Sequence, residues 1–232
     1  MSVGNRVFLK RDLVDKDIME AFKNLPAANV ADTMSRLCAL SSEIRLFGSP
    51  VAPNMVGPAL TVKARPGDNL MLHKALNMAQ EGDIIVVSNE GDRTQALMGE
   101  IMAEFARYKK VGGIVLDGPI RDIKEISEMD LYLYATGSTP GGPYKMGPGE
   151  VNVPISVGNV SIMPGDIILG DADGVIVIPK KYAKEILKAS IEYAKTDAAK
   201  VEAAKNGTAK RNWVEEALEK TNVEIIDGYF EY

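Results

Sequence analysis

Apolar side chains recur about once per helical turn near the start of the chain, which predicts a helical segment over residues 12–40. Pro26 interrupts this pattern and divides it into two helices. Asn29 or Asp32 can cap the second helix, which is expected to run through Leu37. The segment after it, rich in glycine and proline, predicts a loop with room for one edge strand.

From residue 59 the pattern becomes an alternation of short apolar runs and helical stretches. The run Ile84–Ser88 (IIVVS) is almost entirely apolar, which is typical of a strand buried on both faces. Such alternation with short loops indicates a parallel or mixed sheet with crossover helices. The predicted elements are strand 59–64, helix 69–79, strand 84–88, a helix that ends near residue 110, and strand 112–118.

The second half has a different rhythm, with many short β runs between residues 131 and 180. Asp173-Gly174 lies between two apolar runs and predicts a hairpin turn. A long, largely polar helix is expected over residues 180–205, ended by Gly207. Such a helix either packs on a neighbouring subunit or faces solvent, and the sequence favours neither.

Charge and composition narrow the class of protein. The 232 residues include 27 Lys and Arg against 32 Asp and Glu, so the net charge is −5, which disfavours general nucleic-acid binding. The single cysteine excludes an intrachain disulfide and fits a reducing compartment. The start of the chain shows no secretory signal pattern, and no apolar run approaches the roughly 20 residues of a membrane span. We therefore expect a cytoplasmic protein that contacts no membrane.

The residues available for chemistry are limited, because the chain has one histidine and one cysteine. His73 and Cys38 both sit in helical patterns, and a packed structural role is the simpler interpretation of each. A histidine-rich zinc site and a Ser-His-Asp triad are therefore disfavoured. The chemistry must come from carboxylates, Arg, Lys, backbone amides or a metal ion.

Gly99 falls inside an otherwise good helical run, where a glycine costs about 1 kcal/mol relative to alanine. A helix that begins there instead avoids this cost. It exposes the amides of Glu100, Ile101 and Met102 as a site for an anion. The alternative is a glycine that allows close helix packing.

Arg121 and Asp122 follow the buried strand that ends near Leu116. Ligand sites in α/β sheets lie at the carboxyl ends of strands. Arg offers a planar fork of donors to a carboxylate or enolate oxygen, and Asp is a hard oxygen ligand suited to Mg²⁺ or Mn²⁺. The adjacent pair is equally compatible with a structural ion pair.

Four stretches in collinear order resemble the RraA-like family. They are GPALTVKARPGDNLMLHKAL, EGDIIVVS, ALMGEIMAEFARYKKVGGIVLDGPIRD and PGDIILGDADGVIVIP, within residues 57–179. This family includes 4-hydroxy-4-methyl-2-oxoglutarate and 4-carboxy-4-hydroxy-2-oxoadipate aldolases and the regulator of ribonuclease E activity A. The resemblance implies an α/β fold, a swivelling-type β-sandwich or mixed sheet flanked by helices, and assembly as homotrimers or hexamers.

The aldolases of this family carry an acidic residue, twenty intervening residues and then Arg-Asp. Glu100 and Arg121-Asp122 match this spacing, although the strictest form of the motif has Asp at the first position. By resemblance, Asp122 ligates a divalent metal, Mg²⁺ or Mn²⁺, directly, and Glu100 does so through water. Arg121 holds the pyruvyl oxygen of the substrate. The amides around Gly99, Glu100, Ile101 and Met102 receive the substrate carboxylate.

The resemblance predicts one domain over residues 1–232, with a core of about 57–180, a helical N-terminal segment 12–40 and a helical extension 180–220. The expected activity is that of a class II pyruvate aldolase, which cleaves a 4-hydroxy-2-oxo acid to pyruvate and decarboxylates oxaloacetate. The alternatives are a regulator that binds a ribonuclease and a lyase for another oxo or sugar acid. The sequence does not assign the base: it is either a metal-bound water or a carboxylate from a neighbouring subunit, for which Asp32, Asp197 and Glu202 are weak candidates.

Overall fold

The structure is a computed structural model that describes residues 3–230. The described chain forms two compact units, residues 3–193 and 194–230, and the boundary falls within α6. The helices are α1 (Lys16–Phe22), α2 (Ala27–Thr33), α3 (Leu70–Met78), α4 (Glu100–Tyr108), α5 (Ile123–Ser127), α6 (Ala183–Lys205) and α7 (Trp213–Lys220). The strands are β1 (Arg6–Val7), β2 (Arg45–Leu46), β3 (Met55–Ala64), β4 (Ile84–Ser88), β5 (Gly113–Leu116), β6 (Leu133–Ala135), β7 (Gly149–Val151), β8 (Ile155–Val157), β9 (Val160–Ile162), β10 (Ile167–Asp171) and β11 (Gly174–Ile178).

A mixed sheet forms the centre of the first unit, with strand order β1-β7-β3-β4-β5-β6-β2. β3, β4, β5 and β6 run parallel to one another, whereas β7 is antiparallel to β3. The long strand β3 also pairs antiparallel with β10 through Met55–Pro58, before it joins β4. The expected α/β fold, a mixed sheet flanked by helices, is confirmed.

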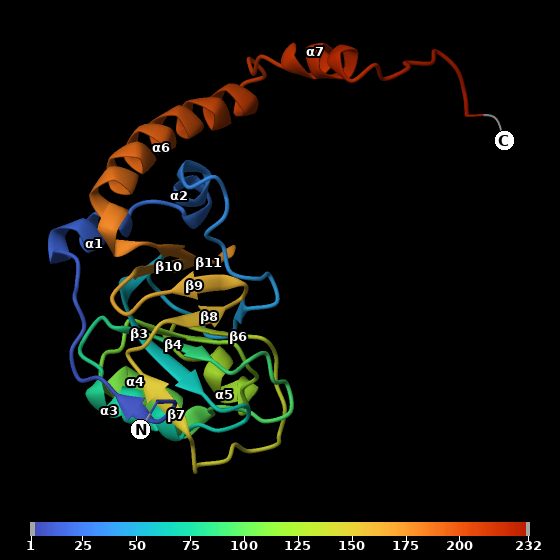
Figure 1. Cartoon of the computed structure of the whole chain (residues 1–232). Helices are drawn as coiled ribbons and strands as arrows, with labels where there is room; N and C mark the ends of the chain where they lie inside the picture. The colour runs from blue at the N-terminus through green and yellow to red at the C-terminus, as the bar shows by residue number, and fades with distance from the viewer. Residues whose placement is uncertain (1–2, 231–232) are drawn as a thin grey trace. The chain divides into compact units, whose positions relative to one another are not determined.

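Two hydrophobic cores lie on opposite faces of this sheet. On one face, side chains of α3 and α4 pack against β3, β4 and β5. On the other face, alternate side chains of the same strands pack against the β8–β9 hairpin and the β10–β11 pair. Figure 1 shows α3, α4 and α5 on the first side and β8 to β11 on the second. β4 and β5 are fully buried because both faces of the sheet are covered, as the apolar runs predicted.

The N-terminal helices begin and end differently from the sequence prediction. The second helix was expected to start at Asn29 or Asp32 and to run through Leu37, but α2 spans Ala27–Thr33 and Pro26 is its N-cap. Pro26 has no side chain that can cap a helix. The Ala27 amide instead donates to Asp171 Oδ2 at 2.9 Å, a partner that local pattern does not reveal.

The other predicted elements are largely found. The edge strand is β2, the Asp173-Gly174 hairpin joins β10 to β11, and the long C-terminal helix is α6, preceded by a 3₁₀ turn. The helix expected before residue 110 is shorter than predicted, because residues 94–98 are not helical and α4 begins at Glu100. The helix start at Gly99 is thus confirmed.

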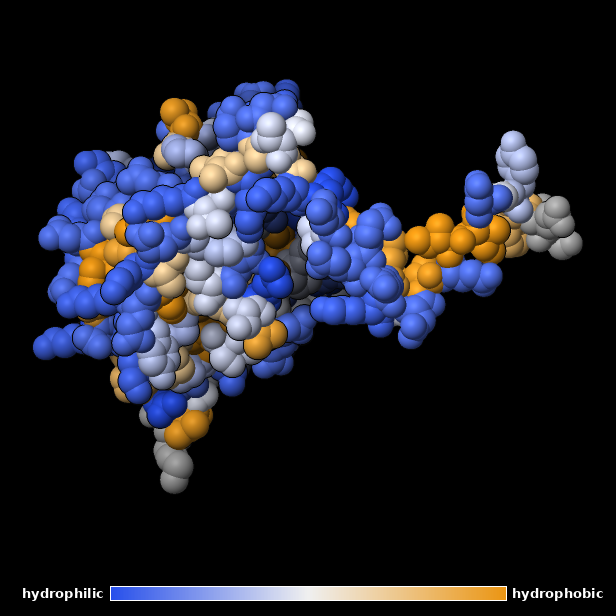
Figure 2. All heavy atoms as spheres, turned by 90° about the horizontal axis from the view of Figure 1, so that it is seen from above, coloured by the Kyte–Doolittle hydropathy of each residue, from blue (hydrophilic) through white to orange (hydrophobic). Residues whose placement is uncertain are grey.

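The second unit contains the end of α6, then α7 and an extended segment. Several of its apolar side chains are exposed, including Trp213, Ile225 and Ile226. Figure 2 shows hydrophobic atoms gathered along this C-terminal segment. Among residues 3–230, no helix is both long and apolar enough to cross a membrane.

Candidate active site

Two loops at the carboxyl edge of the parallel strands form the site. β4 and β5 are neighbours, so the chain leaves both strands at the same edge of the sheet. The loops then pair with each other. The Leu97 amide donates to the Pro119 carbonyl at 2.9 Å, and the Arg121 amide donates to the Met98 carbonyl at 3.0 Å. This pairing places Gly99 beside Asp122, and it explains why the motif needs one helix and one strand between its two halves.

Gly99 is required by space rather than by backbone conformation. Its φ of −144° and ψ of −162° are extended and open to any residue. A Cβ at this position, however, would lie 2.2 Å from Asp122 Oδ2 and 2.9 Å from Arg121 Cγ. The glycine therefore makes room for the two site residues, and the alternative of close helix packing does not account for it.

Asp122 serves as the cap that Gly99 cannot provide. Its carboxylate Oδ2 accepts a hydrogen bond from the Glu100 amide at 3.0 Å, at the N-terminus of α4. A carboxylate there is favoured by the helix dipole. The Asp122 backbone is left-handed, with φ of 58°, a conformation that Asp tolerates better than most residues. The Arg121 Nε lies 3.7 Å from the same oxygen.

The first-turn amides of α4 are not all available to a ligand. The Glu100 amide donates to Asp122, and the Met102 amide donates to the Gly99 carbonyl at 3.2 Å. Within the described part of the chain, the Ile101 amide has no hydrogen-bond acceptor. Of these three amides, only that of Ile101 is therefore available to an incoming anion in this conformation.

A small cavity of about 110 Å³ lies against these groups. Organic ligands of drug size occupy cavities of about 300–1,000 Å³, so this one suits a small acid. Arg121 and Asp122 are partly exposed there, with 44% and 38% of their side-chain surfaces accessible. The lining residues are Asn69, His73, Met98, Gly99, Ile101, Met102, Arg121, Asp122, Pro143 and Lys145. Glu100 is not among them, so its carboxylate lies outside the cavity wall.

Five lining residues were not predicted as site residues: Asn69, His73, Met98, Pro143 and Lys145. Asn69 is the N-cap of α3 and His73 lies within α3, and His73 lines the cavity although its helical pattern favoured a packing role. Burial, and then the charge of Lys145, lowers the pKa of His73, so its imidazole is neutral near pH 7. Pro143 and Lys145 come from the loop between β6 and β7. Their local sequence carries no signal, because only the fold brings this loop to the site.

The donor set can accept a divalent cation. Mg²⁺ typically keeps several waters and binds one or two protein carboxylates together with substrate oxygens. Asp122 Oδ2 lies where a Cβ on residue 99 would collide with it, and its second oxygen has no hydrogen-bond partner in the described chain. No group of three or more His, Cys, Asp or Glu side chains in residues 3–230 could hold a metal. Among the described residues that line the cavity, Asp122 is the carboxylate available to a cation.

The three candidate bases lie elsewhere. Asp32 on α2 is engaged by Arg36 at 2.6 Å and by the Tyr193 hydroxyl at 2.6 Å. Asp197 and Glu202 belong to the second compact unit. None of the three lines the cavity.

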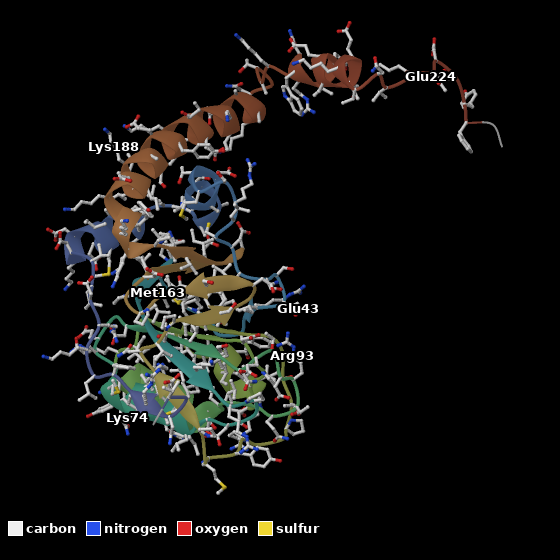
Figure 3. The ribbon with its side chains drawn as sticks, in the orientation of Figure 1. Glu43, Lys74, Arg93, Met163, Lys188 and Glu224 are labelled. Carbon is white, nitrogen blue, oxygen red and sulfur yellow. The ribbon has the colours of Figure 1, made fainter. Side chains whose placement is uncertain are left out.

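A larger polar cavity, of about 740 Å³, lies between the same sheet edge and the β8–β9 hairpin. Arg93 bridges Glu43 at 2.8 Å and Asp117 at 3.6 Å there. Glu43 and Arg93 are labelled side by side in Figure 3. Burial raises the pKa of Asp117, which is the largest effect on that carboxyl. Within this cluster one guanidinium pairs with both carboxylates.

Comparison with known proteins identifies the family. The family model RraA-like, described as Aldolase/RraA, matches residues 27–177. The chain belongs to the RraA-like family. A protein of Halalkalibacterium halodurans, provisionally named a 4-hydroxy-4-methyl-2-oxoglutarate aldolase, is 38% identical to this RraA-like chain over 205 residues, covering 87% of the chain and 96% of the relative.

Solved structures agree with this assignment. Streptomyces coelicolor RraAS2, described as an unusual member of the RNase ES inhibitor RraA protein family, superposes with a TM-score of 0.73 at 25% identity, over 82% of this chain and 98% of that one. The RNA-processing inhibitor RraA from Thermus thermophilis superposes with a TM-score of 0.61 at 30% identity, over 66% and 92%. These relatives of the chain are therefore named either as aldolases or as inhibitors of RNA processing.

Proposed function

We propose that this protein is a divalent-metal-dependent lyase that cleaves a 4-hydroxy-2-oxo acid to pyruvate and also decarboxylates oxaloacetate. The observation that carries the proposal is the convergence of Arg121, Asp122 and the Ile101 amide on one small cavity. The relative named as an aldolase, at 38% identity, supports the same class of reaction.

The reaction breaks the C3–C4 bond and leaves an electron pair on C3. That pair is tolerable when the C2 carbonyl becomes an enolate, so the site must stabilise negative charge at the 2-oxo oxygen. Arg121 suits this task because its guanidinium is permanently charged and presents a planar fork. Its Nη1 lies 3.1 Å from the position of a Cβ on Gly142, so the backbone of that loop limits where the guanidinium can go.

The substrate carboxylate is assigned to the N-terminus of α4, where the Ile101 amide is available. Asp122, with Glu100 through water, would hold Mg²⁺ or Mn²⁺, which would withdraw electron density from the 2-oxo group when bound. His73 is neutral near pH 7 and adds no charge to the wall. Oxaloacetate decarboxylation passes through the same enolate, so both reactions belong to one site. We further propose a homotrimer or hexamer.

The test is a coupled assay of pyruvate release from 4-hydroxy-2-oxo acids and from oxaloacetate. Activity is expected with Mg²⁺ or Mn²⁺ and should vanish in excess chelator, then return when metal is restored. Full turnover after verified metal removal would contradict the assignment of Asp122. The pyruvate assay on purified protein separates an enzyme from a regulator that acts by protein contact. Two structural relatives are named as members of an RNase inhibitor family and as an RNA-processing inhibitor.

A further inference from the structure

The larger polar cavity and the small cavity beside Arg121 lie on opposite faces of the sheet, and they have no lining residue in common. The small cavity is bordered by α3 and α4, whereas the β8–β9 hairpin covers the other face (Figure 1). At about 740 Å³, the larger cavity is within the range of those that bind organic ligands. The proposed reaction uses none of the residues that line it.

Four neighbouring parallel strands end in polar side chains that line this cavity. Lys63 on β3 and Ser88 on β4 are register partners, and Asp117 and Thr136 directly follow β5 and β6. Two positions earlier, on the same face of β4, β5 and β6, lie the buried residues Val86, Val115 and Tyr134. The face therefore changes from apolar to polar at the carboxyl edge of the sheet, where α/β proteins bind ligands. We call these four residues the polar row.

Hydroxyl groups without partners face the cavity from both walls. Ser156 and Ser161 are register partners in the β8–β9 hairpin, and neither hydroxyl has a hydrogen-bond partner within residues 3–230. The Ser88 hydroxyl donates to the Ser156 carbonyl at 2.9 Å, which fixes the hairpin to the polar row. Thr136 Oγ1 is buried and has no partner in the same part of the chain. Buried polar groups are normally hydrogen-bonded, so this exception indicates a missing water or ligand.

A guanidinium held between two carboxylates lies in the wall of the cavity. Arg93 Nη2 lies 2.8 Å from Glu43 Oε2, and Arg93 Nη1 lies 3.6 Å from Asp117 Oδ1. The Gly91 amide also donates to Asp117 Oδ2, at 3.1 Å. This cluster presents N–H donors beside carboxylate acceptors. A hydroxyl group matches such a surface, because it both donates and accepts.

Lys63 forms no ion pair within the described ranges of the chain. Glu150 borders an adjacent cavity together with Lys63, but it is already paired with Arg6. Glu90 lines the larger cavity as an exposed carboxylate and is not within ion-pair distance of Lys63 either. An ammonium group at one end of the polar row is thus available to a carboxylate on a ligand.

We propose that this cavity is a second binding site, for a polyhydroxylated monocarboxylic acid of the sugar-acid class. Lys63 binds the carboxylate, and the rest of the polar row and the Ser156–Ser161 pair bind hydroxyl groups. The row crosses three strand spacings of about 4.8 Å, or about 14 Å. A chain of hydroxylated carbons can therefore contact two or more of its members at once. The inference is independent of the proposed function, because it concerns other residues.

The experiment is isothermal titration calorimetry of the full-length protein with three probes. D-Gluconate has a carboxylate and several hydroxyl groups, sorbitol has a hydroxymethyl group in place of the carboxylate, and hexanoate has a carboxylate and no hydroxyl groups. Gluconate should bind about 10- to 100-fold more tightly than sorbitol, the range for one hydrogen bond to a charged group. Hexanoate should bind more weakly than gluconate, because it satisfies none of the hydroxyl groups in the cavity.

Two variants test the separate parts of the site. Lys63→Gln should weaken gluconate binding about 10- to 100-fold and leave sorbitol unchanged, because it removes the charge alone. Ser156→Ala should weaken both polyols about 2- to 10-fold, the range for one neutral hydrogen bond. It keeps the carbonyl that accepts from Ser88, so the hairpin stays in place. Thermal melting should confirm that both variants are folded.

Two control variants should bind gluconate as the wild type does. Lys74→Gln removes a lysine from α3 (Figure 3) that lines neither cavity. Arg121→Ala alters the small cavity and leaves the larger one intact.

Gluconate that fails to bind at millimolar concentration, or binds no more tightly than hexanoate, would overturn the ligand class. Equal weakening of both polyols by Lys63→Gln would overturn the carboxylate assignment. Gluconate binding that is lost in Arg121→Ala and retained in Lys63→Gln would place the ligand in the small cavity and refute a second site. None of these measurements requires pyruvate release, so they stand or fall separately from the proposed function.

Discussion

Replacing Gly99 by alanine is the sharpest test of the site geometry. The added Cβ would lie 2.2 Å from Asp122 Oδ2, so the carboxylate has to move by about 1 Å to reach an ordinary contact. The backbone itself accepts alanine without strain, because its conformation is extended. The substitution therefore displaces the Asp122 carboxylate, and Arg121 Cγ, 2.9 Å from the added Cβ, has to shift slightly as well.

A displacement of this size is expected to cost about 100-fold in kcat/KM, because a misplacement of about 1 Å in an active site typically has that effect. The same movement breaks the 3.0 Å bond from the Glu100 amide, a helix cap worth about 0.5–2 kcal/mol. For a domain of this size, each 1 kcal/mol lowers Tm by about 2–4 °C. Gly99→Ala should thus fold, melt a few degrees lower and lose most of its activity.

The assay is pyruvate release with saturating Mg²⁺ or Mn²⁺, alongside thermal melting by circular dichroism. Gly91→Ala is the control, since Gly91 lies in the same loop and no atom lies within 4 Å of its added Cβ. Its φ of 73° makes alanine unfavourable by about 1–2 kcal/mol, so it should lose stability without losing turnover. Near-wild-type turnover in Gly99→Ala would show that the position of Asp122 does not matter for the reaction.

Three further outcomes are expected. Arg121→Lys should stay folded and lose ~10²–10³ in kcat for aldol cleavage and decarboxylation together, and loss of one reaction alone would refute a shared enolate. Light scattering of active protein should give a trimer or a multiple of it, and a fully active monomer would exclude a site that needs a neighbour. The Arg6 hydrogen bond lowers the pKa of Glu150 below its ordinary 4.5 despite the opposing effect of burial, so its stabilisation is present above pH 4.5 and is lost as pH falls through the lowered value. Glu150→Gln should therefore be less stable than wild type in urea unfolding at pH 7, and the gap should close at strongly acidic pH; a gap independent of pH would contradict this.

The sheet and the start of α4 could be predicted from sequence because both depend on local pattern. The run at Ile84–Ser88 is apolar throughout, and a buried strand between two covered faces requires that. Gly99 marked the helix start, although the reason for glycine there is steric and involves residues more than twenty positions away. The cost of a glycine inside a helix was enough to predict where α4 begins, but it did not reveal why glycine occupies that position.

Residues 94–98 show why pattern alone overextends α4. Their side chains fit a helix, but the Leu97 amide and the Met98 carbonyl bond to the next loop instead. These tertiary hydrogen bonds outweigh helix propensity, which is a weak preference. Lys145 could not be predicted as a site residue for a related reason, since its loop reaches the cavity through Asp68 and backbone bonds that no local pattern encodes.

Two helices in this fold are capped in the same way, by an aspartate distant in sequence. Comparing the two distinguishes a structural carboxylate from a functional one. α2 follows Pro26 and α4 follows Gly99, and neither residue has a side chain able to cap, so a distant aspartate serves each helix. Asp171 uses both oxygens, accepting the Ala27 amide and the Asp173 amide, each at 2.9 Å.

Asp122 uses one oxygen for the Glu100 amide, and its other oxygen has no partner in the described chain although it belongs to a residue that lines the cavity. Removing Asp171 would leave only backbone donors unsatisfied. Removing Asp122 would also remove the one cavity-lining carboxylate. The same capping geometry that stabilises α4 therefore holds this carboxylate beside Arg121, where a cation and a small acid can meet.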